Sequence, residues 1–159
     1  MTKKQLFETY ITENLDRIYR FAYTYTKNQQ DAEDVVNESV VKALKAIDTL
    51  KSKEYMGTWF YRIVINTALS HLRTQNKIVY LDMAEAEAIA GKGDDYADLS
   101  FEQMIDILEP KYKSIVVLRF FEGMTLSEIA EILEENLNTV KTRLYRALGM
   151  LRIEMEDIV

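Results

Sequence analysis

The chain contains no cysteine, one proline and five glycines among its 159 residues. Without cysteine it cannot form a disulfide, a thiolate metal site or a cysteine nucleophile. The single histidine, His71, cannot build a multi-histidine metal site. Proline and glycine supply most tight turns, so their scarcity argues against a fold rich in β-hairpins.

Long apolar runs are missing as well. No stretch reaches the roughly 20 apolar residues that a membrane-spanning helix needs, and residues 1–13 hold no apolar signal-peptide core. We therefore expect a cytoplasmic protein without membrane insertion. The sequence also lacks a glycine-rich phosphate loop, metal-ligand spacing and a nucleophile beside a base, so we expect no cofactor, no metal and no enzymatic activity.

Positive charge is outnumbered: 20 Lys and Arg stand against 26 Asp and Glu, for a formal net charge of −6. The total argues against nucleic-acid binding, because polyanions attract basic surfaces. The excess is local, however, since residues 76–110 hold nine acidic and two basic side chains, whereas residues 136–152 hold four basic and no acidic ones. We interpret residues 76–100 as an acidic linker; a solvated loop within one domain is the alternative.

Helix-forming residues dominate what remains, and apolar residues recur every three or four positions. This predicts an all-α fold of two small helical domains, residues 1–75 and 101–159. In the first domain we expect three helices separated by a short break and by a loop at residues 48–58. They cover about residues 6–25, 31–47 and 59–72, with Asp31 and Thr58 as N-caps.

The second domain is predicted to hold four helices. After a short helix at 101–108, Pro110 suits the first turn of the next helix and Gly123 ends it. Thr125 and Glu128 have the spacing of a capping box that opens a helix ending at residue 133. Asn136 then caps a last helix over about residues 137–156.

Only about three residues separate these last two helices, which is typical of a helix-turn-helix whose second helix lies in the major groove of DNA. The spacing turns Val140, Leu144, Ala147, Leu148 and Leu151 toward the core. Arginine can donate two hydrogen bonds to guanine, threonine and tyrosine suit thymine, and a helix start can bind phosphate. The candidate DNA-binding residues are Asn138, Thr139, Lys141, Thr142, Tyr145 and Arg146. A solvated basic helix is the alternative interpretation.

Three motifs in series resemble one family. They are Asp31-Ala-Glu-Asp-Val-Val-Asn-Glu, Thr58-Trp-Phe-Tyr-Arg-Ile-Val-Ile-Asn66-Thr-Ala and Thr139-Val-Lys-Thr-Arg143-Leu-Tyr-Arg-Ala. These motifs, in this order, resemble those of the extracytoplasmic-function (ECF, group IV, sigma-70 family) sigma factors of bacterial RNA polymerase. The resemblance covers residues 6–152. The resemblance implies a protein that binds core RNA polymerase, directs it to specific promoters and helps initiate transcription.

The resemblance also implies a division of roles. Residues 1–75 would be sigma region 2, which binds polymerase and melts the minus-ten element, and residues 101–159 would be sigma region 4, which reads the minus-thirty-five element. Implied partners are core RNA polymerase, through its beta-prime clamp and beta flap, promoter DNA and an anti-sigma factor. The implied polymerase-binding residues are Asp34, Val35, Asn37, Glu38 and Val41, and the implied minus-ten residues are Arg62, Asn66 and Ser70.

Several features refine this comparison. The loop at 48–58 and the helix after it resemble the part that holds a flipped promoter base, while Trp59, Phe60 and Tyr61 are predicted to be core residues. Glu134-Glu135 stands where many members have a small residue followed by an apolar one. We expect His71 to be a surface or partly packed residue without a functional role. The minus-thirty-five residues implied by the family are Lys141, Thr142, Tyr145 and Arg146.

Two other functions fit parts of the sequence. A one-component helix-turn-helix regulator would sense a ligand through residues 1–75 and bind a palindrome as a dimer. A helical interaction protein would use no DNA at all. A sigma factor, unlike the first of these, should bind promoter DNA poorly until core polymerase is added.

Overall fold

The computed structural model describes residues 1–75 and 101–151, which contain helices and no strand, confirming the all-α prediction. The chain divides into two compact units, Met1–Lys77 and Ile78–Val159. The predicted acidic linker, 76–100, and the predicted end of the last helix lie outside the described residues. Within the described ranges, no helix has the length and apolar character needed to cross a membrane.

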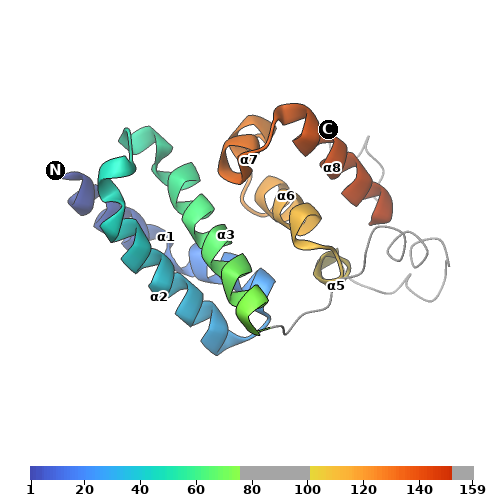
Figure 1. The fold of residues 1–159 in the computed structure, drawn as a ribbon, viewed down its shortest axis with the longest axis horizontal. Helices are drawn as coiled ribbons and strands as arrows, with labels where there is room; N and C mark the ends of the chain where they lie inside the picture. Colours follow the sequence, from blue (N-terminus) through green and yellow to red (C-terminus); the bar gives the residue numbers. More distant parts are fainter. Residues whose placement is uncertain (76–100, 152–159) are drawn as a thin grey trace. The chain divides into compact units, whose positions relative to one another are not determined.

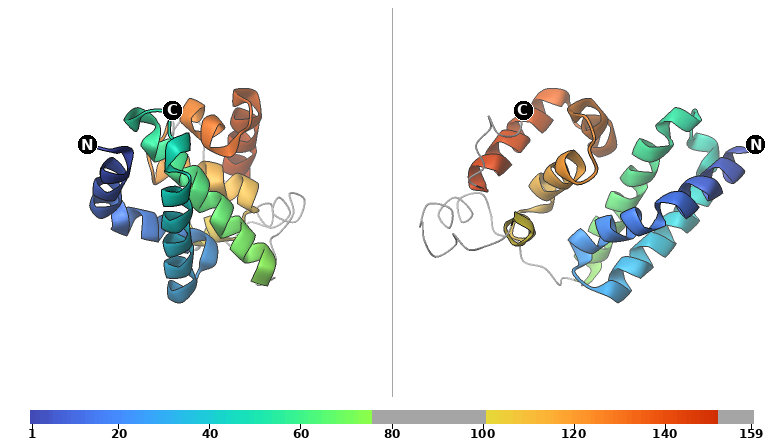
Figure 2. Two further views of the ribbon diagram at one scale, coloured as in Figure 1. Left: turned by 60° about the vertical axis from the view of Figure 1, so that its left-hand side comes forward. Right: turned by 180° about the vertical axis from the view of Figure 1, so that it is seen from behind.

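Three long helices form the first unit, and each packs against the other two (Figure 1, Figure 2). Two short 3-10 turns, Ile47–Thr49 and Lys53–Tyr55, join the second helix to the third. The helices are α1 (Lys3–Thr26), α2 (Gln29–Lys45) and α3 (Met56–Gln75).

Aromatic rings fill the interface between α1 and α3. The ring of Phe7 meets that of Phe60 at 5.2 Å between centroids, and Phe21 meets Tyr61 at 4.8 Å, both edge to face. This geometry brings the positive edge of one ring to the negative face of another. The four side chains are buried, so they fix α3 along α1.

Two helix starts differ from the prediction. Lys27 adopts the left-handed conformation that ends α1, and Asn28 then caps α2 by accepting a hydrogen bond from the Asp31 N–H. Asp31 is therefore the third residue of α2 and not its cap. Thr58 likewise lies inside α3, because the 3-10 turn before it leads directly into the helix and its hydroxyl donates to the Tyr55 carbonyl.

The described part of the second unit consists of four helices. They begin largely as predicted: Pro110 occupies the first turn of one helix, and Thr125 and Glu128 exchange both hydrogen bonds of the capping box. Gly123, with φ 65, follows the helix that starts at Pro110, in a conformation that favours glycine. The elements are α5 (Phe101–Asp106), α6 (Pro110–Phe120), α7 (Leu126–Leu133) and α8 (Leu137–Met150).

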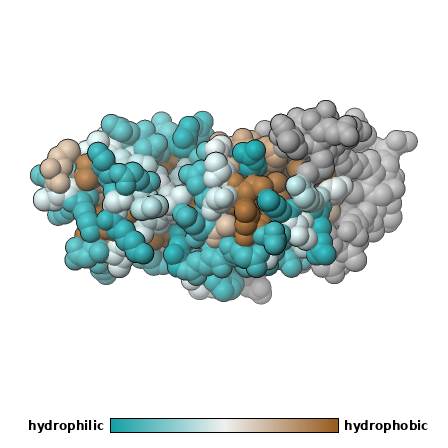
Figure 3. Space-filling view, turned by 90° about the horizontal axis from the view of Figure 1, so that it is seen from above, coloured by the Kyte–Doolittle hydropathy of each residue, from teal (hydrophilic) through white to brown (hydrophobic). Residues whose placement is uncertain are grey.

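Helix α6 packs against both α7 and α8, and its Ile115, Val116 and Leu118 are fully buried. Polar residues cover most of the molecular face in Figure 3, and brown apolar atoms reach the surface in small patches. The large apolar side chains that stay exposed among the described residues are Met1, Leu15, Tyr23, Val41, Tyr55, Phe121, Leu137 and Tyr145. Two of them, Val41 and Tyr145, belong to the predicted interfaces.

Candidate polymerase and promoter interfaces

The candidate polymerase-binding residues lie on α2. Asn37 and Glu38 each lie three or four residues from both Asp34 and Val41, and all four residues are exposed. They therefore form one stripe, hereafter the α2 stripe, with Val41 as an exposed apolar residue at its end. Val35 differs from the other predicted residues because it is 0% exposed and packs inside the unit.

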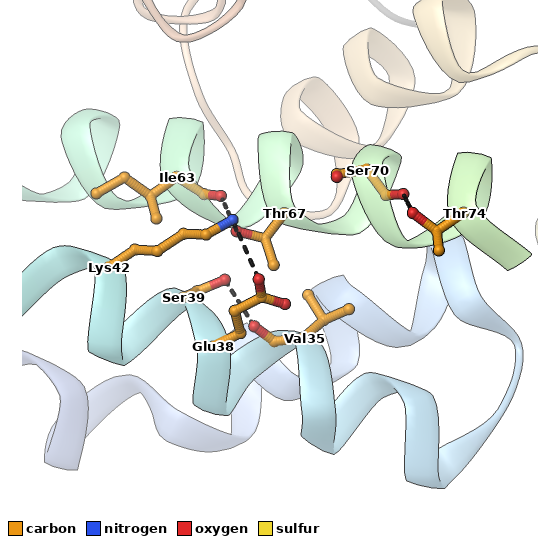
Figure 4. A network of polar contacts seen from close by, with 8 residues as sticks. All are labelled: Val35, Glu38, Ser39, Lys42, Ile63, Thr67, Ser70 and Thr74. Atoms are coloured by element: carbon orange, nitrogen blue, oxygen red, sulfur yellow. Dashed lines mark hydrogen bonds and ion pairs between the residues drawn. The ribbon is translucent and has the colours of Figure 1, made fainter.

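Lys42 connects the α2 stripe to α3 (Figure 4). Its Nζ lies 3.4 Å from the Glu38 carboxylate and donates a hydrogen bond of 3.2 Å to the Thr67 hydroxyl. That hydroxyl donates in turn to the Ile63 carbonyl of α3. Since the Lys42–Glu38 pair is about half exposed, it contributes little stability.

Asp31 and His71 form a second link between α2 and α3. The His71 Nε2 lies 3.5 Å from the Asp31 carboxylate, and both side chains are largely shielded from solvent. Among the described residues this buried nitrogen has no hydrogen-bond partner. His71 is thus partly packed, as expected, and it joins the first turn of α2 to the last part of α3.

Partial burial is the main cause of a raised pKa at the Tyr19 hydroxyl, and the charge of Glu33 adds to it. The phenol donates a hydrogen bond of 3.3 Å to the Gln29 carbonyl. This contact joins α1 to the first residue of α2, which is N-terminal to the α2 stripe.

The minus-ten candidates form a stripe on α3. Arg62, Asn66 and Ser70 are four residues apart and all exposed. The Ser70 backbone carbonyl accepts a hydrogen bond from the Thr74 hydroxyl one turn later (Figure 4). We call these three residues the α3 stripe.

The aromatic start of α3 is divided between core and surface. Phe60 and Tyr61 are buried, which confirms the core prediction for these two residues. Trp59 is only partly buried, and its indole Nε1 donates a hydrogen bond of 3.1 Å to the Thr49 hydroxyl. The ring thereby reaches back to the segment that joins α2 to α3.

Helices α7 and α8 are separated by three residues, as predicted for a helix-turn-helix. Glu134 ends α7 in the left-handed conformation, with φ 56 and ψ 41, and the Glu135 N–H donates to the Ala130 carbonyl. Asn136 caps α8 by accepting a hydrogen bond of 2.7 Å from the Thr139 N–H. Both helix ends in the turn thus satisfy backbone groups that would otherwise lack partners.

The faces of α8 separate core from surface in the predicted way. Val140, Leu144, Ala147, Leu148 and Leu151 are all buried. The predicted DNA-binding residues remain accessible, and the Tyr145 ring is 51% exposed. Asn138, Lys141, Thr142 and Arg146 are exposed with it, and Thr139 is partly exposed.

Arg143 belongs to the same motif but has a different environment. Its guanidinium donates a hydrogen bond of 3.2 Å to the Glu135 carboxylate in the turn, and the two side chains are partly exposed. The unusual Glu134-Glu135 pair therefore supplies a left-handed helix end and a partner for Arg143. This pairing holds the Arg143 guanidinium against the turn between α7 and α8.

Sequence reasoning missed the contacts that join separate elements. The Lys42–Thr67 hydrogen bond joins residues 25 positions apart, and no local sequence pattern predicts it. The pairs Asp31–His71 and Thr49–Trp59 also depend on how the helices pack. In residues 1–75 and 101–151, no group of three or more acidic or histidine side chains could hold a metal ion.

Family models of sigma-70 proteins match segments of both units. The model of sigma-70 region 2 matches residues 10–78, and that of sigma-70 region 4 matches residues 98–151. The RNA polymerase sigma factor SigV of Bacillus subtilis (strain 168) is 47% identical over 160 residues, covering 99% of this chain and 96% of that protein. The ECF RNA polymerase sigma factor SigW of the same organism is 30% identical, covering 90% of this chain and 85% of its own length.

A solved structure has a similar fold. It is the sigma factor RpoE of Bartonella quintana in complex with the anti-sigma factor NepR, with a TM-score of 0.70 and 20% identity. The match covers 92% of this chain and 94% of that one.

Proposed function

This chain belongs to the ECF family of RNA polymerase sigma factors, and we propose that its exposed stripes divide polymerase binding and promoter recognition between its two units. As a member of that family it binds RNA polymerase and directs it to promoters. It acts as an initiation factor without catalysis of its own, in the cytoplasm, where RNA polymerase works.

The α2 stripe is proposed to bind the beta-prime clamp of core polymerase. Its acidic start, at Asp34 and Glu38, suits arginines on a partner helix, because a carboxylate accepts two parallel hydrogen bonds from guanidinium. Lys42 orients the Glu38 carboxylate before binding, and Val41 offers apolar surface beside it. Val35 supports the stripe from inside the unit.

The α3 stripe is proposed to bind the minus-ten element after it opens. A base that leaves the stack loses stacking energy, a cost of a few kcal/mol, which hydrogen bonds to its edge must offset. Asn66 carries both a donor and an acceptor for that purpose, and Arg62 and Ser70 lie one turn to either side. Residues 1–75 would therefore act as sigma region 2.

The exposed face of α8 is proposed to read the minus-thirty-five element as duplex DNA. Lys141, Thr142, Tyr145 and Arg146 face away from the helix-turn-helix core, where they can reach base edges. Asn138 and Thr139 lie at the helix start, where phosphate binds well. Residues 101–159 would then act as sigma region 4, with the beta flap as a further partner.

An anti-sigma factor is the proposed regulatory partner. The sigma factor of Bartonella quintana, which shares this fold, was solved in complex with one. Such a partner would prevent initiation by covering the α2 stripe or the exposed face of α8.

The observation that carries this proposal is the exposure of its polar residues. Every polar member of the three sets is at least partly exposed, at helical spacing, and the sets lie on three different helices. Amphipathic helices expose polar residues for folding alone, so exposure makes these residues available to partners, and the match of the two units to sigma-70 regions 2 and 4 supports the roles proposed for them.

Separate variants of two stripes test the assignments. Asn66→Ala should leave affinity for core polymerase unchanged and slow promoter opening, which a fluorescent base in the minus-ten element reports. The combined change Asp34→Ala and Glu38→Ala should weaken core binding at least tenfold, because charge-assisted hydrogen bonds are worth about 1.5–3 kcal/mol each. Loss of core affinity in Asn66→Ala, with an intact fold, would contradict its assignment to DNA.

A further inference from the structure

A hydrogen bond between two side chains joins residues 46–55, the connecting segment, to the first turn of α3. The Trp59 indole Nε1 donates to the Thr49 hydroxyl at 3.1 Å, and that hydroxyl donates to the Ala46 carbonyl at 2.6 Å. These two hydrogen bonds form a continuous path from Trp59 of α3 to Ala46 at the end of α2. The donor and acceptor roles of the Thr49 hydroxyl are both used.

The indole ring is fixed from the other side by α1. Its ring meets Phe7 edge to face, with centroids 5.9 Å apart and an interplanar angle of 87°. Phe7 is itself 1% exposed, so this support belongs to the core. Leu50, next to Thr49, is equally buried and anchors the middle of the connecting segment. Packing thus sets the ring's orientation, and its N–H sets the position of Thr49.

Trp59 also shares a face with the α3 stripe. Asn66 and Ser70 follow it by seven and eleven residues, and at about 100° per residue all three positions lie within roughly 20° of one direction. The connecting segment is therefore attached at the N-terminal end of the face that carries Asn66. Tyr55, at the end of that segment, is half exposed.

We propose that Trp59 is a positioning residue for minus-ten recognition: its indole holds the connecting segment so that the segment forms one wall of the pocket for the extruded base. This inference rests on the proposed function of Asn66. A wall that is already in place requires no ordering when the base arrives, and the ordering of a loop is a cost that weakens binding. Trp59 acts through Thr49 and need not touch the DNA.

Two conservative variants separate the hydrogen bond from the packing. Trp59→Phe keeps an aromatic ring against Phe7 and removes the donor. Thr49→Val keeps the shape of the threonine and removes the acceptor, together with the local bond that the hydroxyl donates to the Ala46 carbonyl. The readout is the affinity of holoenzyme for a single-stranded oligonucleotide that carries the minus-ten non-template sequence. We expect each variant to bind it about fivefold more weakly, the effect of one net hydrogen bond of about 1 kcal/mol. The double variant should be no weaker than either single variant.

Three controls make the test specific. Thr12→Val removes an exposed threonine hydroxyl that donates only within α1, to the Glu8 carbonyl, and should have no effect. Affinity for a duplex with the minus-thirty-five element and affinity for core polymerase should remain unchanged in all variants.

Unchanged affinity for the minus-ten strand in Thr49→Val would overturn the inference. An equal loss of minus-ten, minus-thirty-five and core affinity would also overturn it, because that result describes a general structural role. Failure of the unaltered holoenzyme to bind the minus-ten strand would instead contradict the proposed function, and with it this inference.

Discussion

Glu134 ends α7 with φ 56 and ψ 41, in the left-handed region where glycine is the usual residue. For a residue with a Cβ this conformation costs roughly 1–2 kcal/mol. We therefore expect Glu134→Gly to raise the free energy of unfolding by about 1 kcal/mol, since the greater freedom of glycine in the unfolded chain offsets part of the gain. Denaturant unfolding of the full chain measures the change.

Glu131→Gly is the matched control for this prediction. Glu131 is also an exposed glutamate of α7, but it lies within the helix, where glycine lowers stability by about 1 kcal/mol relative to alanine. The two variants should therefore move stability in opposite directions. Equal destabilisation by both would show that the left-handed turn stores no strain.

Arg146 and Arg143 allow a comparison within one element, because both belong to α8 and differ in their surroundings. Arg146 is exposed on the face proposed to read DNA, whereas Arg143 is paired with Glu135 across the turn. Arg146→Ala should lower promoter affinity by about 1–3 kcal/mol and relax the preference at one base pair. Arg143→Ala should change base preference little, and holoenzyme binding to a set of minus-thirty-five duplexes measures both.

Loss of discrimination at the same base pair in Arg143→Ala would contradict the assignment of roles within α8. A loss of fold is a separate outcome, and circular dichroism of both variants detects it. The comparison needs the same salt concentration throughout, because phosphate contacts make affinity depend steeply on salt.

Helix starts whose capping residues lie within a few positions of one another could be predicted from the sequence. Pro110, the Thr125–Glu128 capping box and the Asn136 cap each combine a local side chain with a local backbone need, and the structure contains all three. The start of α2 was predicted wrongly at Asp31. Asn28 is an equally suitable cap, and the choice between them follows from Lys27 taking the left-handed conformation.

The candidate site was only partly predictable for a related reason. The motifs identified polar residues that lie on exposed faces, whereas Val35 of the polymerase-binding set is buried, and the contacts around these sets join distant parts of the chain. Lys42 reaches Thr67, His71 lies beside Asp31, and Trp59 bonds to Thr49 only because α1, α2 and α3 pack together. Helix packing decides such pairs, and a local pattern carries no information about them.

At the scale of the whole molecule, the uneven charge makes a prediction about the free protein. Residues 76–110 hold nine acidic and two basic side chains, while the exposed face of α8 is basic. We hypothesise that the acidic segment competes with DNA for that face. Changing Asp94, Asp95 and Asp98 to asparagine should then raise the affinity of the free protein for promoter duplex, and the gain should shrink as salt screens the charges.

Neutralising three acids of α1, Glu8, Glu13 and Asp16, gives the same change in net charge at another place and serves as the control. Fluorescence anisotropy with a labelled duplex measures both triple variants. Equal affinity of the linker variant and the unaltered chain would reject the hypothesis. An equal increase in both variants would trace the effect to net charge alone.

The central claim is that this chain directs RNA polymerase to promoters, and reconstituted transcription tests it most directly. Purified chain is combined with bacterial core polymerase and a library of promoter sequences, and transcripts are sequenced to locate their starts. We predict transcripts from a small set of promoters that share minus-thirty-five and minus-ten elements, with only background from core polymerase alone. A library in which no promoter is transcribed above that background would contradict the account.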